Sequence, residues 1–324
     1  MIKKLTLLAM VGALSSTTFT STAIAAWTPV KPVEFVVMAG KGGGADKAVR
    51  LLQSIIAADN MSPVPFTPIN KPGGSGAEAL VHMKGRTGDD HTIMFTLNSF
   101  YTTPLRQPKL GVDIATFTPI ARMAEDTFLL WVHSDRTDIN NMADFAKAAK
   151  EKGKKWIMAG TGKNSEDNLL TDFLNKAYGL QMKYVPYKGG GKVAKELAGK
   201  NADSTVNNPS EQLGFYEAGT TKALASFTDK RLPLFPDAPT FKELGKDYVY
   251  YMQRTVVGAP GMSQEASDYY QDLFKKVFNS QKWQDYRTKK SLQGDLMQGD
   301  ALMSYWMKER DVHEVMLKNM GAIK

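Results

Sequence analysis

The chain has 324 residues, of which 41 are Lys or Arg, 33 are Asp or Glu and none is Cys. A chain without Cys has no disulfide, no thiolate-bound metal and no Cys nucleophile. The formal net charge of +8 favours anionic partners. Basic and acidic residues alternate, however, as in Lys150-Glu151-Lys152, which is typical of a solvated helix face, so we expect no nucleic-acid partner.

Residues 1–26 are predicted to be a secretory signal peptide. Lys3 and Lys4 precede an apolar run over 5–14, and a Ser/Thr-rich stretch then leads to Ala23-Ile24-Ala25. The apolar run is too short to cross a bilayer, which needs about 20 apolar residues. We therefore expect cleavage near Ala25–Trp27 and a soluble protein in the bacterial periplasm.

The first part of the mature chain alternates strands with helices. A strand over 33–38 leads through a Gly-rich turn over 39–45 into a helix that opens at Asp46. The apolar face of this helix repeats at helical spacing. A strand over 65–69, a Gly-rich turn over 72–76, a helix over 77–84 and a strand over 92–97 follow.

The same order restarts near residue 128. The predicted strands are 128–132, 156–159, 184–186, 203–206 and 256–258, and the predicted helices are 142–151, those after Ser165, Gly191 and Ser210, 265–279 and 300–320. The pattern predicts an α/β fold in two lobes joined by strands, which suits a hinge. We expect lobe one over 27–125 and 255–300, lobe two over 126–254, and a C-terminal helix over 301–324 packing on the lobes.

Four Gly-rich turns, at 39–45, 72–76, 160–162 and 189–191, sit where strands end and helices begin. Ligands of open α/β sheets bind at these ends, and helix N-termini offer N–H donors to anions. Each turn alone is typical of any strand-to-helix connection. Four of them, two in each lobe, predict a cleft that binds an anion.

The segments Ala39-Gly40-Lys41-Gly42-Gly43-Gly44-Ala45-Asp46 and Asn70-Lys71-Pro72-Gly73-Gly74-Ser75-Gly76 resemble the Bug/TctC-like receptors of tripartite tricarboxylate transporters. Segments 160–162, 186–191, 237–240 and 258–261 fall in the order of that family. The resemblance implies a periplasmic-binding-protein-like (type II) fold that closes on a small organic carboxylate, with a di- or tricarboxylate favoured. It also implies delivery to a two-component integral membrane permease, with no catalysis and no cofactor. We expect a monomer.

The resemblance places the ligand on main-chain N–H groups and ordered waters of the two lobe-one loops. Polar groups after the third strand and in the lobe-two turns are expected to complete the site. The candidate ligand-binding residues are Gly43, Gly44, Ala45, Asp46, Gly73, Gly74, Ser75, Gly76, Asn98, Ser99, Thr161, Gly162, Lys163, Asn164, Ser165, Tyr187, Gly189, Asn207 and Asn208.

The sequence allows two roles for each of three charged candidates. Lys41 stands where many family members have Pro, and it either favours a more anionic ligand or points to solvent. Asp46 either caps its helix or receives a ligand ammonium or a water. Arg254 either clamps a distal carboxylate bidentately or is a surface residue.

Two other functions compete with a transport receptor. Residues 40–45 match G-x-G-x-x-A, the glycine pattern of a dinucleotide site in an NAD-dependent oxidoreductase. That site needs an acidic residue at the end of the second strand, where this chain has Asn70-Lys71. An exported sensor whose closed lobes dock on a signalling partner would have the same sequence features. The spacing of the four His residues does not suggest a zinc site.

Overall fold

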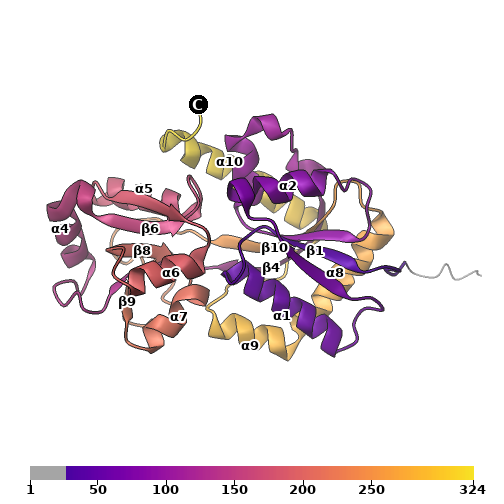
Figure 1. The fold of residues 1–324 in the computed structure, drawn as a ribbon, viewed down its shortest axis with the longest axis horizontal. Coiled ribbons are helices and arrows are strands. Elements are labelled where there is room, and N and C mark those ends of the chain that lie inside the picture. The colour runs from indigo at the N-terminus through magenta and orange to yellow at the C-terminus, as the bar shows by residue number, and fades with distance from the viewer. Residues whose placement is uncertain (1–26) are drawn as a thin grey trace, which may run out of the picture.

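The computed structural model describes residues 27–324, which form two α/β lobes lying side by side (Figure 1). The predicted signal peptide lies outside the described residues. Each lobe is built on a five-stranded sheet covered by helices. The α/β, two-lobed fold class predicted from the sequence is confirmed. No helix of residues 27–324 is both long and apolar enough to cross a membrane.

The sheet of lobe one has the order β2-β1-β3-β10-β4. Its strands are β1 (Val33–Val37), β2 (Phe66–Asn70), β3 (Thr92–Thr96), β4 (Thr118–Asp126) and β10 (Met252–Gly258). Its helices are α1 (Gly44–Ala58), α2 (Ala77–Lys84), α3 (Ser99–Arg106), α8 (Gln264–Asn279) and α9 (Gln281–Lys289). Since β1, β2 and β3 are parallel, their carboxyl ends meet at one edge. The predicted apolar face of α1 is buried in the core beside Phe35 and Phe274.

The sheet of lobe two has the order β7-β6-β8-β5-β9. Its strands are β5 (Leu129–His133), β6 (Ile157–Thr161), β7 (Lys183–Tyr187), β8 (Ser204–Asn207) and β9 (Thr221–Ser226). Its helices are α4 (Met142–Lys152), α5 (Glu166–Tyr178), α6 (Gly190–Ala198) and α7 (Pro209–Glu217). Strands β6, β7 and β8 are parallel, so their carboxyl ends also share an edge. Trp156, Phe227 and Phe241 lie in the core of this lobe.

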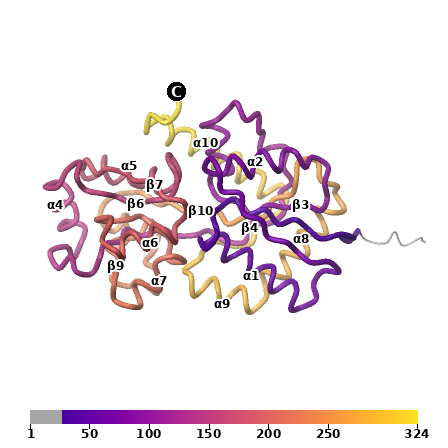
Figure 2. The backbone as a smooth tube through the Cα atoms, in the orientation of Figure 1, coloured from indigo at the N-terminus to yellow at the C-terminus, as the bar shows by residue number. Residues whose placement is uncertain are grey.

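The chain crosses between the lobes next to the antiparallel pair of β4 and β10 (Figure 2). The pair runs from Thr118 opposite Gly258 to Asp126 opposite Met252. The long C-terminal helix α10 (Gly299–Asn319) adds a link outside the sheets. Its residue Trp306 lies in a core cluster of lobe one, whereas Met316 packs against the core of lobe two.

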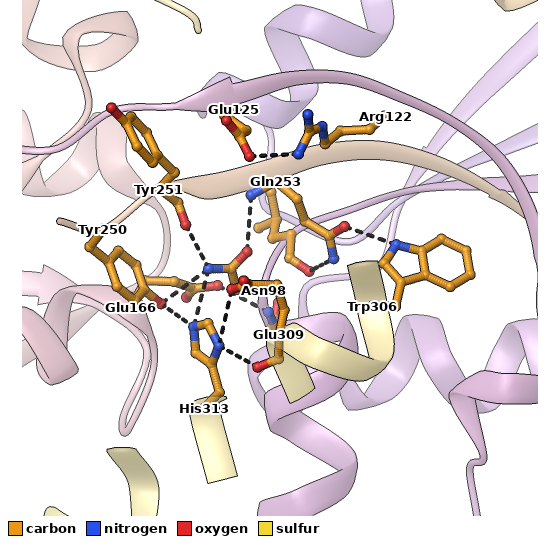
Figure 3. Close-up of polar contacts among 12 residues, drawn as sticks. Asn98, Arg122, Glu125, Glu166, Tyr250, Tyr251, Gln253, Trp306, Glu309 and His313 are labelled. Atoms are coloured by element: carbon orange, nitrogen blue, oxygen red, sulfur yellow. Dashed lines mark hydrogen bonds and ion pairs between the residues drawn. The ribbon is translucent and has the colours of Figure 1, made fainter. Parts of the chain in front are cut away.

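A buried polar network ties α10 to the crossover (Figure 3). Asn98 accepts a hydrogen bond from the Gln253 N–H (2.9 Å), and Gln253 Oε1 accepts one from Trp306 Nε1 (3.1 Å). His313 Nδ1 lies 2.8 Å from the Glu309 carbonyl and therefore carries the proton, so Nε2 accepts from the Tyr250 hydroxyl at 2.9 Å. Burial lowers the pKa of His313 to about 4, which keeps it neutral.

Sequence patterns found most elements within two or three residues but missed α3, β4, β9 and α9. Helix α3 contains Pro104 and two Thr residues, which are poor helix formers, and it forms because Phe100 and Tyr101 are buried. The helix predicted to open at Asp46 begins at Gly44, with Gly43 at the N-cap. Asn141 caps α4 as predicted, by accepting from the Asp144 N–H. Ser165 stands at the N-cap position of α5, but its hydroxyl donates to the Thr161 carbonyl instead.

Candidate functional site

A cavity of about 470 Å³ lies between the two lobes, at the strand ends where the Gly-rich loops meet. This volume is within the range of small-molecule sites, about 300–1,000 Å³. The wall brings together residues of both lobes that the sequence singled out. These are Gly43, Gly44, Ala45, Gly73, Gly74, Ser75, Gly76, Ser99, Thr161, Gly162, Ser165, Tyr187, Gly189, Asn208 and Arg254.

The loop before α2 is left-handed at three consecutive residues, with φ of 62° at Gly74, 57° at Ser75 and 92° at Gly76. Side chains that are not part of the cavity wall hold it from behind. Thr103 Oγ1 donates to the Ser75 carbonyl (2.7 Å), and Gln107 Nε2 donates to the Gly74 carbonyl (3.2 Å). These two bonds fix the main chain of Gly74 and Ser75 where it lines the cavity.

The N-terminus of α1 touches lobe two. The Gly44 N–H donates to Glu211 Oε1 at 2.6 Å. A Cβ at Gly44 would lie 2.6 Å from Ser210 Oγ and 2.8 Å from Arg254 Nη2, so a larger residue requires these side chains to shift while the lobes are in contact. The Ser99 N–H donates across the cleft to Glu166 Oε1 at 3.0 Å. Both contacts join a main-chain donor of lobe one to a carboxylate of lobe two.

Three carboxylates of lobe two, Glu166, Asp167 and Glu211, line the cavity, and the sequence analysis did not select them. They occupy the first turns of α5 and α7, where acidic residues commonly compensate the helix dipole. The Thr161 N–H donates to Asp167 at 2.7 Å. Burial, with the charges of Glu166 and Glu211, raises the pKa of Asp167 to about 8. Burial also raises the pKa of Glu166. Their position in the first turns of the helices that follow the Gly-Thr-Gly and Asn-Asn segments is the signal that would have identified them.

Arg254 lines the cavity and is itself only 3% exposed. Its guanidinium forms a buried ion pair with Asp126, with Nε 2.9 Å from Oδ2. Burial raises the pKa of Asp126 to about 6 although the charge of Arg254 acts to lower it. The surface interpretation of Arg254 is therefore wrong, and its charge is already shared with a protein carboxylate.

The other candidates lie outside the cavity wall. Asp46 accepts from the Gly42 N–H (2.9 Å) and binds Arg50 and Asn70, whereas Asn98 belongs to the network at the crossover. Asn207 donates to the Gly190 carbonyl at 3.1 Å and so braces the start of α6. The remaining residues off the wall are Lys41, Lys163 and Asn164. Within residues 27–324, no group of three His, Cys, Asp or Glu is arranged to hold a metal ion.

Two lobes around a cavity at the strand ends define a periplasmic-type solute-binding protein. Residues 56–321 match the model of the tripartite tricarboxylate transporter family receptor, and the chain belongs to this family. The "UPF0065 protein in gbd 5'region" of Cupriavidus necator is 24% identical over 299 residues, which cover 91% of this chain and 89% of that protein.

Solved structures share the fold. The periplasmic binding protein BugD superposes with a TM-score of 0.83 at 22% identity, over 91% of this chain and 99% of its own. Rpa4515 of R. palustris, solved with adipate, superposes with a TM-score of 0.82 at 24% identity, over 90% of this chain and 98% of its own. The family favours the receptor over the dinucleotide enzyme as the interpretation of the glycine pattern.

Proposed function

We propose that this protein is a periplasmic receptor that captures a small organic carboxylate and carries out no reaction on it. The observation that carries the proposal is the cavity between the lobes, with the left-handed loop of Gly74, Ser75 and Gly76 in its wall. The loop is held in shape from behind by Thr103 and Gln107. In this proposal, main-chain N–H groups of the Gly-rich loops donate to the ligand. Such a preformed set of donors suits a carboxylate.

In this mechanism the carboxylate binds first to lobe one, and lobe two then closes over it. The contacts from Gly44 and Ser99 to lobe two are the closing contacts. Closure removes water, and charge-assisted hydrogen bonds strengthen in the buried site. The carboxylate bound to Rpa4515 supports this ligand class. The loaded, monomeric receptor would then deliver its ligand to a two-component membrane permease, in keeping with its family.

A thermal-shift screen of residues 27–324 against organic acids, amino acids, sugars and NAD tests the proposal. A ligand at 100 times its Kd adds about 2.7 kcal/mol of stability, which is readily seen as a higher melting temperature. We expect shifts only with compounds that carry a carboxylate. A shift with NAD alone would contradict the proposal in favour of a dinucleotide site. Loss of uptake of the identified ligand in cells lacking this protein would test delivery.

A further inference from the structure

The two walls of the cavity carry different charge. Lobe one contributes mainly the main chain of its Gly-rich loops, together with the exposed Glu78, which is paired with Lys71. Lobe two contributes the carboxylates of Glu166, Asp167 and Glu211, together with the exposed Lys188. From this asymmetry we infer that the ligand is a small zwitterion, such as an amino acid, with its carboxylate on lobe one and its ammonium facing these three acids. The inference rests on the proposed function and makes the three acids its specificity determinants.

The charges of Arg106 and Arg254 act to lower the pKa of Glu166, but neither residue forms a direct ion pair with an acid of this wall. Among the described residues, no Lys or Arg forms an ion pair with any of them, and the guanidinium of Arg254 is paired with Asp126. Each acid instead accepts from main-chain N–H groups or a hydroxyl. Glu166 accepts from Ser99, Asp167 from Thr161, and Glu211 from Gly44 and Ser210.

Because these acids are buried, they discriminate between an ammonium and a carboxylate on the ligand. Glu166 is 5% exposed and Asp167 is 3% exposed, so solvent screens their charge little. The three acids are close enough to influence one another, because the charges of Glu166 and Glu211 both act to raise the pKa of Asp167. A dicarboxylate spanning the cavity would bring its second carboxylate against this wall. An ammonium in the same place would be attracted to it and would offer three N–H donors.

In the alternative arrangement, the ligand is a dicarboxylate. The three acids would then be protonated and would donate hydrogen bonds to the second carboxylate of the ligand. A dicarboxylate would bind as tightly as an amino acid of the same carbon skeleton, and binding would take up protons from solution. The two arrangements therefore predict different relative affinities for matched ligands.

Isothermal titration calorimetry at pH 7.5 with residues 27–324 separates them. The matched pairs are succinate and aspartate, glutarate and glutamate, and butyrate and 4-aminobutyrate, with adipate as a longer dicarboxylate. We expect the amino-bearing member to bind at least about 10-fold tighter in the pair that binds best, a difference of about 1.4 kcal/mol. If succinate, glutarate or adipate binds as tightly or tighter, the inference is overturned and the proposed function stands. If no carboxylate binds, the proposed function fails and the inference falls with it.

Glu166→Gln and Glu211→Gln test the assignment to lobe two. Gln keeps an acceptor for the N–H groups of Ser99 and Gly44 but removes the charge. We expect the preference for the amino-bearing ligand to fall at least about fivefold in one of these variants. Glu217→Gln, at an exposed position on the same helix as Glu211, is the control and keeps the preference. Should both variants fold and retain the full preference, other groups select the ligand and the inference is overturned.

Discussion

The two walls of the cleft are made from the same unit, a parallel strand followed by a helix, and yet they present opposite chemistry. In lobe one, glycines precede α1 and α2, and the main chain reaches the cavity. In lobe two, α5 and α7 begin with acidic residues that reach it instead. Lobe one also has acidic residues in the first turns of α1 and α2. Asp46 is bound to Arg50 and Asn70 away from the cavity, and Glu78 in the cavity wall accepts from the Gly73 N–H and pairs with Lys71. The two lobes therefore differ in whether a basic side chain forms an ion pair with the first-turn carboxylates.

The largest effect is expected at the buried pair of Arg254 and Asp126, which joins β10 to β4 next to the crossover between the lobes. Arg254→Met leaves Asp126 buried without its partner, which should lower the free energy of unfolding by about 3–5 kcal/mol. Chemical denaturation at pH 7.5 measures it. The double variant Arg254→Met/Asp126→Leu should recover most of the loss. A single variant as stable as the wild type would show that the pair is not a net structural contact.

Gly44→Ala should separate closure from folding. The added Cβ would lie 2.6 Å from Ser210 Oγ and 2.9 Å from Glu211 Oε1 of lobe two, so we expect it to hold the cleft open. We expect ligand affinity to fall about 100-fold, or about 2.7 kcal/mol, with little change in the melting temperature of the free protein. Gly43→Ala is the matched control, because its Cβ would meet nothing closer than 3.5 Å. Equal affinities of the two variants would argue against the closing contact.

Gly76→Ala should damage the donor loop of lobe one. Its φ of 92° is unfavourable for alanine, and the Cβ would lie 2.6 Å from Met38 Cε. We expect a loss of about 2 kcal/mol in stability and weaker ligand binding. Gly88→Ala, with φ of 78° and open space around it, should cost about 1 kcal/mol and leave binding intact. Denaturation and calorimetry on both variants check this, and unchanged binding by Gly76→Ala would remove the loop from the site.

Asp167→Asn should give the smallest effect, and one that depends on pH. The pKa of Asp167 is raised from 3.8 to about 8 in the folded protein, so its contribution to stability is present below the unfolded value and is lost as the pH rises to about 8. Asn keeps an acceptor for Thr161 and has no proton to lose. The variant should therefore gain about 1–2 kcal/mol on the wild type between pH 5 and pH 8. Parallel pH profiles from thermal melts would contradict the raised pKa.

Much of the fold could be predicted because its signals are local. Each of these signals predicts one element and its place in the sheet: the alternating apolar strands, the 3.6-residue face of α1 and the glycines at strand ends. Helix α3 could not be predicted in this way, because its residues favour other structures and only the burial of Phe100 and Tyr101 stabilises it.

The residues of the candidate site also divide into those with a local sequence signal and those without one. The glycine loops were found because a left-handed backbone needs a particular residue type. The acids of lobe two were missed because an acidic first turn is common and its sequence does not say which way the side chain points. Asn98 shows the converse, since a polar residue after a strand suggests a ligand donor, whereas its amide is fully used by Tyr251 and Gln253. Only the packing of α10 on the crossover explains that position.

Helix α10 has a mechanical consequence. Its 21 residues form a rod about 31 Å long at 1.5 Å per residue. One end is fixed by Trp306 in lobe one, and the other end meets lobe two at Met316 and through the bond from Lys176 to the Asn319 carbonyl. A rotation of one lobe against the other must displace the last turns of this rod or detach them from lobe two. The position of the C-terminus therefore depends on the angle between the lobes. A fluorescent label at the C-terminus would report changes in that angle.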